Sequence, residues 1–106
     1  MVLSPKKSKV HEQDQVHRQE RDFRVIARRN KLLGHWAAER LGITGAEADV
    51  YAKQVVSSDL EEPGDEDVIR KVLGDFESRG VALERSELEA EMETLLDEAR
   101  NQIADS

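Results

Sequence analysis

A cluster of basic side chains in one stretch of the sequence is the feature best suited to recognising another molecule. Arg24, Arg28 and Lys31 recur at steps of four and three residues, so a helix would carry them on one face. Such a row binds the phosphates of a nucleotide or the acidic side chains of a protein. It equally pairs with acidic helices of its own fold, and these three alternatives stay open. The whole cluster consists of Arg24, Arg28, Arg29, Lys31 and Arg40.

The three histidines favour neither a metal site nor a catalytic base. His11 and His17 lie six residues apart, a spacing that suits neither one helix face nor the usual zinc pairs. His35, next to Trp36, is predicted to be a partly buried structural histidine. A role as pH sensor stays open for all three, because imidazole titrates near neutrality. The chain has no cysteine, which excludes thiolate chemistry and cysteine-based zinc sites.

Motifs of common catalytic sites are missing from the sequence. It contains no glycine-rich phosphate loop, no G-x-S-x-G elbow and no H-E-x-x-H helix. Carboxylates are plentiful, but they fall at expected helix starts or opposite the apolar stripes, as a solvated face would. We therefore predict a protein that is not an enzyme and that carries no cofactor and no metal.

Composition indicates one small helical domain with an uneven charge. The chain has 106 residues, of which 38% are hydrophobic and only 4% aromatic, so its core must be thin and mostly aliphatic. Residues 1–40 hold 10 Lys and Arg against 5 Asp and Glu, a balance of +5. Residues 41–106 hold 6 against 18, a balance of −12, which completes the net charge of −7. Such an acidic body predicts that nucleic acid and anionic membranes are not partners.

Hydropathy predicts neither a membrane span nor a secretory signal. No stretch of 18 consecutive apolar residues occurs. Lys6 and Lys7 supply positive charge near the N-terminus, but no apolar segment follows them, as a signal peptide requires. We expect a cytoplasmic protein without direct membrane insertion.

Apolar spacing predicts a long helix from about Asp22 to Leu41, ended by Gly42. Within it, Gly34 lowers helix stability by about 1 kcal/mol relative to alanine. We interpret this glycine as a place where another backbone approaches closely. The predicted apolar stripe consists of Phe23, Ile26, Leu33, Trp36, Ala37 and Leu41, with Leu32 beside it.

Three shorter helices complete the prediction. Residues 44–47 (TGAE) form a capping box that begins a helix running to about Ser57. The next helix follows a Pro-Gly turn, has three carboxylates at residues 65–67, and ends at Gly80. Residues 86–89 (SELE) form a second capping box that opens the last helix. The fold class is therefore all-α, a four-helix bundle over residues 21–106.

Residues 1–20 differ from the rest of the chain because they show no sustained apolar period. We predict that this segment is a mobile N-terminal arm, disordered or only partly helical on its own. The domain organisation is then an arm, residues 1–20, followed by a globular four-helix domain.

Several stretches of the sequence resemble the zeta-subunit family of alphaproteobacterial F-type ATP synthases. The similarity covers about residues 23–106 and implies a four-helix bundle with a mobile N-terminal arm. The stretches are ARRNKLLG at 27–34 with WAAE at 36–39, GAEA at 45–48 with YAK at 51–53 and VV at 55–56, and EEPGDEDV at 61–68 with RKV at 70–72.

The resemblance implies a regulatory inhibitor of ATP hydrolysis, peripheral at the inner membrane through the ATP synthase. In that family the arm enters an interface between an alpha and a beta subunit, folds there as a helix, and contacts the gamma rotor. The bundle holds the arm from outside. His17 lines up with the family's arm, and the implied partner-binding residues are His17, Phe23, Arg24, Arg28, Arg29, Lys31 and Trp36.

One departure from the family concerns the arm. Family arms mix acidic residues with several phenylalanines, whereas residues 1–20 here contain no aromatic residue. Buried aromatic anchors usually dominate the binding energy of an interface. We therefore expect reduced inhibitory potency. The alternative is a small helical module that binds an adenine nucleotide or another protein without inhibiting.

Overall fold

The computed structural model describes residues 3–59 and 64–104, and their side chains from residue 21 onward. It contains four helices, α1 (Leu3–Leu41), α2 (Ala46–Ser58), α3 (Glu66–Ser78) and α4 (Arg85–Ala104). No strand occurs in the described ranges, so the predicted all-α, four-helix fold is confirmed. Among the described residues, no helix is both long and apolar enough to cross a membrane.

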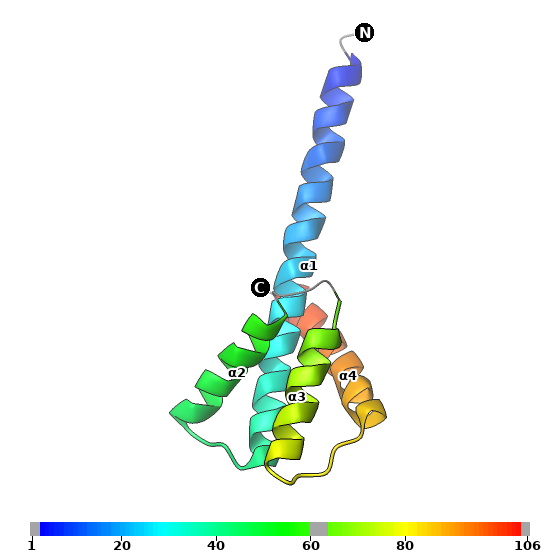
Figure 1. The fold of residues 1–106 in the computed structure, drawn as a ribbon. Coiled ribbons are helices and arrows are strands. Elements are labelled where there is room, and N and C mark those ends of the chain that lie inside the picture. Colours follow the sequence, from blue (N-terminus) through cyan, green and yellow to red (C-terminus); the bar gives the residue numbers. More distant parts are fainter. Residues whose placement is uncertain (1–2, 60–63, 105–106) are drawn as a thin grey trace.

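The longest helix, α1, is the element around which the others pack. It contacts all three of them, most extensively α2 and α4. Figure 1 shows α2, α3 and α4 surrounding the C-terminal half of α1, while its N-terminal half extends well beyond the bundle. The molecule is accordingly elongated, with principal extents of 65, 25 and 21 Å.

The first helix begins at Leu3, much earlier than the predicted start near Asp22, so that boundary is wrong. Pro5 falls in the first turn, where proline is tolerated, and residues 6–20 contain neither proline nor glycine. The apolar period therefore marks where α1 gains helical neighbours rather than where it begins. The side chains of residues 1–20 lie outside the described residues, and the mobility of the arm stays a prediction.

Both predicted capping boxes are wrong. The N-cap of α2 is Gly45, with φ 64° and ψ −140°, and no side chain caps this helix. Because this φ lies in the left-handed region that favours glycine, the helix begins after Gly45 rather than at Thr44. The last helix begins at Arg85, so Ser86 lies inside its first turn. The helix-ending positions of Gly42 and Gly80 are confirmed, because α1 ends at Leu41 and α3 at Ser78.

The described core is aliphatic apart from two aromatic side chains. Phe76 is 1% exposed and Tyr51 is 7% exposed, and both lie among Leu, Val, Ile, Met and Ala side chains from all four helices. Phe23, predicted in the apolar stripe, is 63% exposed, and its neighbour Val25 is buried in its place. The fully buried large apolar side chains are Leu33, Val55, Val68, Val72, Phe76 and Leu88.

The predicted close approach at Gly34 is confirmed. A Cβ atom built on Gly34 would lie 2.5 Å from the Cα atom of Ala52 and 2.9 Å from its Cβ atom. The backbones of α1 and α2 are therefore in direct contact at this point, and only glycine leaves room for the contact.

Candidate functional site

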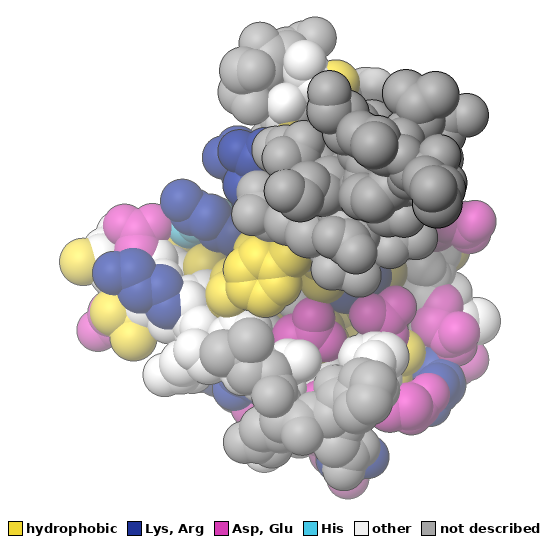
Figure 2. Space-filling model, turned by 90° about the horizontal axis from the view of Figure 1, so that it is seen from above, with side chains coloured by type: hydrophobic (Ala, Val, Ile, Leu, Met, Phe, Trp, Pro, Cys, Tyr) yellow, Lys and Arg dark blue, Asp and Glu magenta, His cyan; other side chains and the backbone are white. Residues whose placement is uncertain are grey.

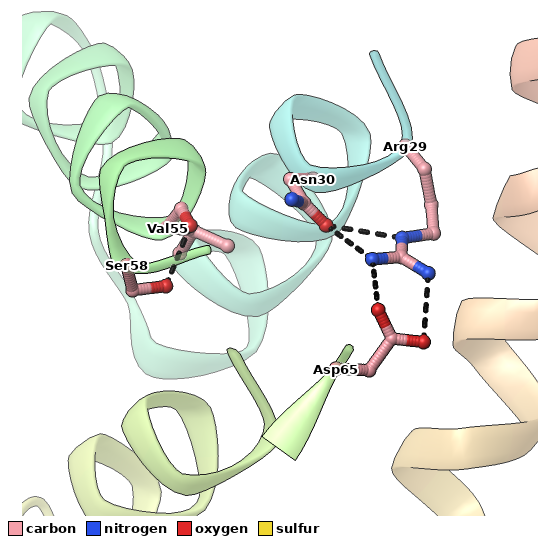
Figure 3. Close-up of polar contacts among 5 residues, drawn as sticks. All are labelled: Arg29, Asn30, Val55, Ser58 and Asp65. Atoms are coloured by element: carbon pink, nitrogen blue, oxygen red, sulfur yellow. Dashed lines mark hydrogen bonds and ion pairs between the residues drawn. The ribbon is translucent and has the colours of Figure 1, made fainter. Parts of the chain in front are cut away.

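The most buried member of the basic cluster, Arg29, is held inside the bundle. Its side chain is 3% exposed and forms an ion pair with Asp65, with Nη2 2.8 Å from Oδ1 and Nη1 3.2 Å from Oδ2. Nε and Nη2 also donate to Oδ1 of Asn30, at 3.0 and 2.8 Å. Figure 3 shows the guanidinium between these two groups. Arg29 thus connects α1 to the N-cap of α3. Its guanidinium donates to residues of its own fold rather than to an external partner.

A group of carboxylates surrounds this arginine at the α2–α3 connection. Burial raises the pKa of Asp59, the C-cap of α2, and the charges of Asp65 and Asp67 raise it further. A hydrogen bond from Asn30 and the charge of Arg29 oppose that rise. In Asp67, Oδ1 accepts from Arg70 at 3.1 Å, while Oδ2 is buried without a hydrogen-bond partner among the described residues.

This environment predicts a pH-dependent effect of Asp59→Asn. A raised pKa in the folded state means that ionised Asp59 lowers the free energy of unfolding, and that this penalty fades as pH falls toward the ordinary aspartate pKa of about 3.9. The variant should be more stable than the unaltered chain at pH 7 and equal to it near pH 4. Urea denaturation at both pH values checks this. Asp97→Asn, at an exposed position, is the control, and a difference that does not depend on pH would contradict the prediction.

The remaining basic residues of the cluster lie on the surface of α1. Arg24 and Lys31 are exposed, and neither forms an ion pair with any described residue. Arg28 donates from Nη1 to Oε1 of Gln102 on α4, at 2.9 Å. Phe23 precedes Arg24 and is also exposed. The structure therefore leaves Phe23, Arg24 and Lys31 exposed along α1.

Trp36 and Arg40 have partners within the fold. The rings of Trp36 and Phe76 stack with their centroids 6.1 Å apart, and the Arg40 guanidinium lies 4.6 Å from the centroid of Trp36. Arg40 also pairs with Glu87 of α4 at 3.2 Å. Trp36 is therefore half-buried between the core and a cation, and little of its ring remains for a partner.

Of the histidines considered above, the structure describes the side chain of His35 but not that of His17. The side chain of His17 lies outside the described residues. His35 is half-buried, with Nε2 3.7 Å from Oδ1 of Asp49 on α2, which fits the predicted structural role. Among the described residues, no group of three or more His, Cys, Asp or Glu side chains is arranged to hold a metal.

A groove that the sequence did not reveal lies between α1 and the C-terminal end of α4. It encloses about 790 Å³, and arginines from both helices line it above apolar side chains. Figure 2, seen from the end where α1 leaves the bundle, shows most of the acidic side chains to the right, while basic side chains lie mainly to the left, with a few of each sign on both sides. The groove, hereafter the α1–α4 groove, is lined by Arg21, Asp22, Arg24, Val25, Ile26, Leu96, Arg100, Ile103 and Ala104.

Comparison with known proteins places this fold in a family. A family model described as ATPase inhibitor subunit zeta matches residues 2–102. A protein solved by solution NMR is 48% identical; the alignment covers 78% of this chain and 94% of that one, with a TM-score of 0.70. No curated protein matches the chain. Because the family model spans nearly all of the sequence, the chain belongs to the ATPase inhibitor subunit zeta family.

Proposed function

We propose that this chain docks on the catalytic head of the F-type ATP synthase and blocks ATP hydrolysis there. The family match over residues 2–102 carries the proposal. Residues 1–20 act as the effector at an interface between an alpha and a beta subunit, in contact with gamma. The bundle remains outside this interface and holds the segment in place.

The surface at the base of the arm supports this role. Phe23 is the one exposed aromatic side chain in the described part of the chain, and burying a phenylalanine contributes about 1.5–3 kcal/mol. Arg24 follows it directly and Lys31 lies two turns further along α1, and neither charge is neutralised by an ion pair with a described residue. Charges of this kind mainly accelerate encounter and orient the partner, while the aromatic side chain anchors it.

The same geometry favours a protein partner over an adenine nucleotide. Arg29 is buried and ion-paired, and Arg28 donates one hydrogen bond to Gln102, so Arg24 and Lys31 are the exposed cations of the cluster for which no described partner is found. These two residues lie about 10 Å apart along the helix axis, at 1.5 Å per residue. The α1–α4 groove is lined by Arg24 but not by Lys31, so these two cations do not share that pocket for a nucleotide, whereas both can meet carboxylates spread over a protein surface.

The test is ATP hydrolysis by the cognate catalytic head in the presence of the full chain or of residues 21–106. We expect inhibition by the full chain only, because residues 1–20 are the effector. Circular dichroism must show that the shortened chain is still helical. Because residues 1–20 lack aromatic anchors, half-inhibition is expected well above nanomolar concentration. Inhibition by both chains would contradict the role of the arm, and inhibition by neither would contradict the proposed function.

A further inference from the structure

We propose that the α1–α4 groove receives an acidic, amphipathic helix of the catalytic head, as a second docking site for the bundle. This inference rests on the proposed function. It adds a contact formed by α1 and α4 together, and α4 is the last helix of the chain. The partner chemistry follows from the charge of the groove rim, the apolar character of its floor, and its shape.

The rim of the groove is positive in a chain whose net charge is −7. Arg21 and Arg24 are exposed and form no ion pair with the described residues, and Arg100 approaches from α4. Arg100 pairs with Asp97 at 3.2 Å, but the two side chains are 61% and 72% exposed, so this pair is weak and readily exchanged. Asp22 is the one carboxylate among the described residues of the lining. The described lining therefore holds three arginines against one carboxylate, and an acidic occupant would balance this positive charge.

The floor of the groove is apolar, which excludes a purely ionic occupant. Val25 is buried, and Ile26 and Leu96 are half-buried beneath the arginines. A small anion would neutralise the rim but leave these side chains facing water. A segment with carboxylates on its flanks and apolar side chains between them satisfies both parts of the lining.

The shape of the groove indicates a helix. Its walls are two packed helices, and the groove between two such helices accepts the side-chain ridges of a third. On α4 the lining extends from Leu96 to Ala104, about 12 Å or two turns at 1.5 Å per residue. Carboxylates one or two turns apart on the occupant would reach arginines on both walls.

A second docking site would act on affinity rather than on the inhibitory step. Once the arm is bound, the groove meets its partner within the same complex, so each contact raises the effective concentration of the other. Losing the groove contact should weaken binding while saturating protein still inhibits fully. This separates the groove from residues 1–20, whose loss abolishes inhibition.

The test is the full-length variant Arg100→Glu, with binding to the purified catalytic head and inhibition of hydrolysis measured separately. We expect binding at least tenfold weaker than that of the unaltered chain, with unchanged inhibition at saturation. Arg79→Glu is the matched control, because it makes the same charge change at the C-cap of α3, at the far end of the bundle (Figure 1). Melting curves of both variants should match that of the unaltered chain.

A photo-cross-linking amino acid in place of Arg100 identifies the occupant directly. Mass spectrometry of the cross-linked complex should find a helical segment of the head with carboxylates one or two turns apart. A basic or uncharged segment would overturn the inference. So would displacement of the Leu96 and Arg100 amide signals in the free chain by millimolar ATP, since the groove would then be a small-anion site.

The outcomes also separate this inference from the function on which it rests. If the unaltered chain binds and inhibits, and Arg100→Glu binds equally well, the groove contact is wrong and the inhibitor role stands. If the unaltered chain does not bind the head, both are wrong. Weaker binding by Arg100→Glu but not by Arg79→Glu supports both.

Discussion

Gly34→Ala is expected to destabilise the bundle by about 1–2 kcal/mol. Its new methyl group would lie 2.5 Å from the Cα atom of Ala52, and backbone cannot rotate away as a side chain can. Overpacking of this kind typically costs about 1–3 kcal/mol, and here it forces apart the most extensive helix pair of the fold. The higher helix propensity of alanine returns only about 1 kcal/mol. Urea denaturation followed by circular dichroism measures the net loss.

Gly74→Ala is the matched control for this prediction. Gly74 also lies within a helix, α3, but nothing lies within 4 Å of the position that a Cβ atom would take. Alanine should therefore raise the free energy of unfolding by about 0.5–1 kcal/mol, through helix propensity alone. If Gly34→Ala were as stable as Gly74→Ala, the close contact between α1 and α2 would be incorrect.

The second large effect is expected for Phe76→Ala, at about 3–5 kcal/mol. Phe76 is 1% exposed, and truncating a buried phenylalanine removes its burial energy and leaves a cavity. A loss of this size is a large part of the stability of a small domain. Trp36 loses its stacking partner, so the fluorescence of the folded variant should also differ from that of the unaltered chain. The denaturation midpoint gives the loss of stability.

The only other phenylalanine of the chain should behave in the opposite way. Phe23 is 63% exposed, so Phe23→Ala is expected to change stability by less than about 0.5 kcal/mol. It should instead weaken binding to the catalytic head, because it removes the proposed aromatic anchor. Unchanged binding would assign no docking role to Phe23, and a large loss of stability would contradict its exposed position.

The sequence was sufficient to predict the helices because their signals are local. Apolar residues at helical spacing located the helix cores, and glycines marked the ends of α1 and α3. Even the close packing at Gly34 could be expected, since a glycine inside a strong helical pattern usually has a packing reason. The predicted cap of α2 was wrong because Gly45 occupies the N-cap position without a side-chain hydrogen bond. Gly45 therefore takes the position that the prediction gave to the preceding threonine.

The candidate site was less predictable because it depends on contacts between distant residues. Arg29 looks like its exposed neighbours in the sequence, and the carboxylate that neutralises it in the interior, Asp65, lies 36 residues later. Phe23 continues the apolar period of α1 beyond the point where other helices cover that face. The α1–α4 groove brings Arg21 and Arg100 together from the two ends of the bundle domain, a pairing that no local pattern contains.

The continuity of α1 has a consequence for the angular position of its two halves. One unbroken helix, Leu3–Leu41, joins residues 3–20 to the core residues, so the backbone of the two halves shares one helical register. Each residue of an α-helix turns the chain by about 100°. A one-residue insertion near Asp22 would therefore rotate the entire arm by that angle while leaving its composition intact. A seven-residue insertion would restore the azimuth to within about 20° and displace the arm by about 10 Å.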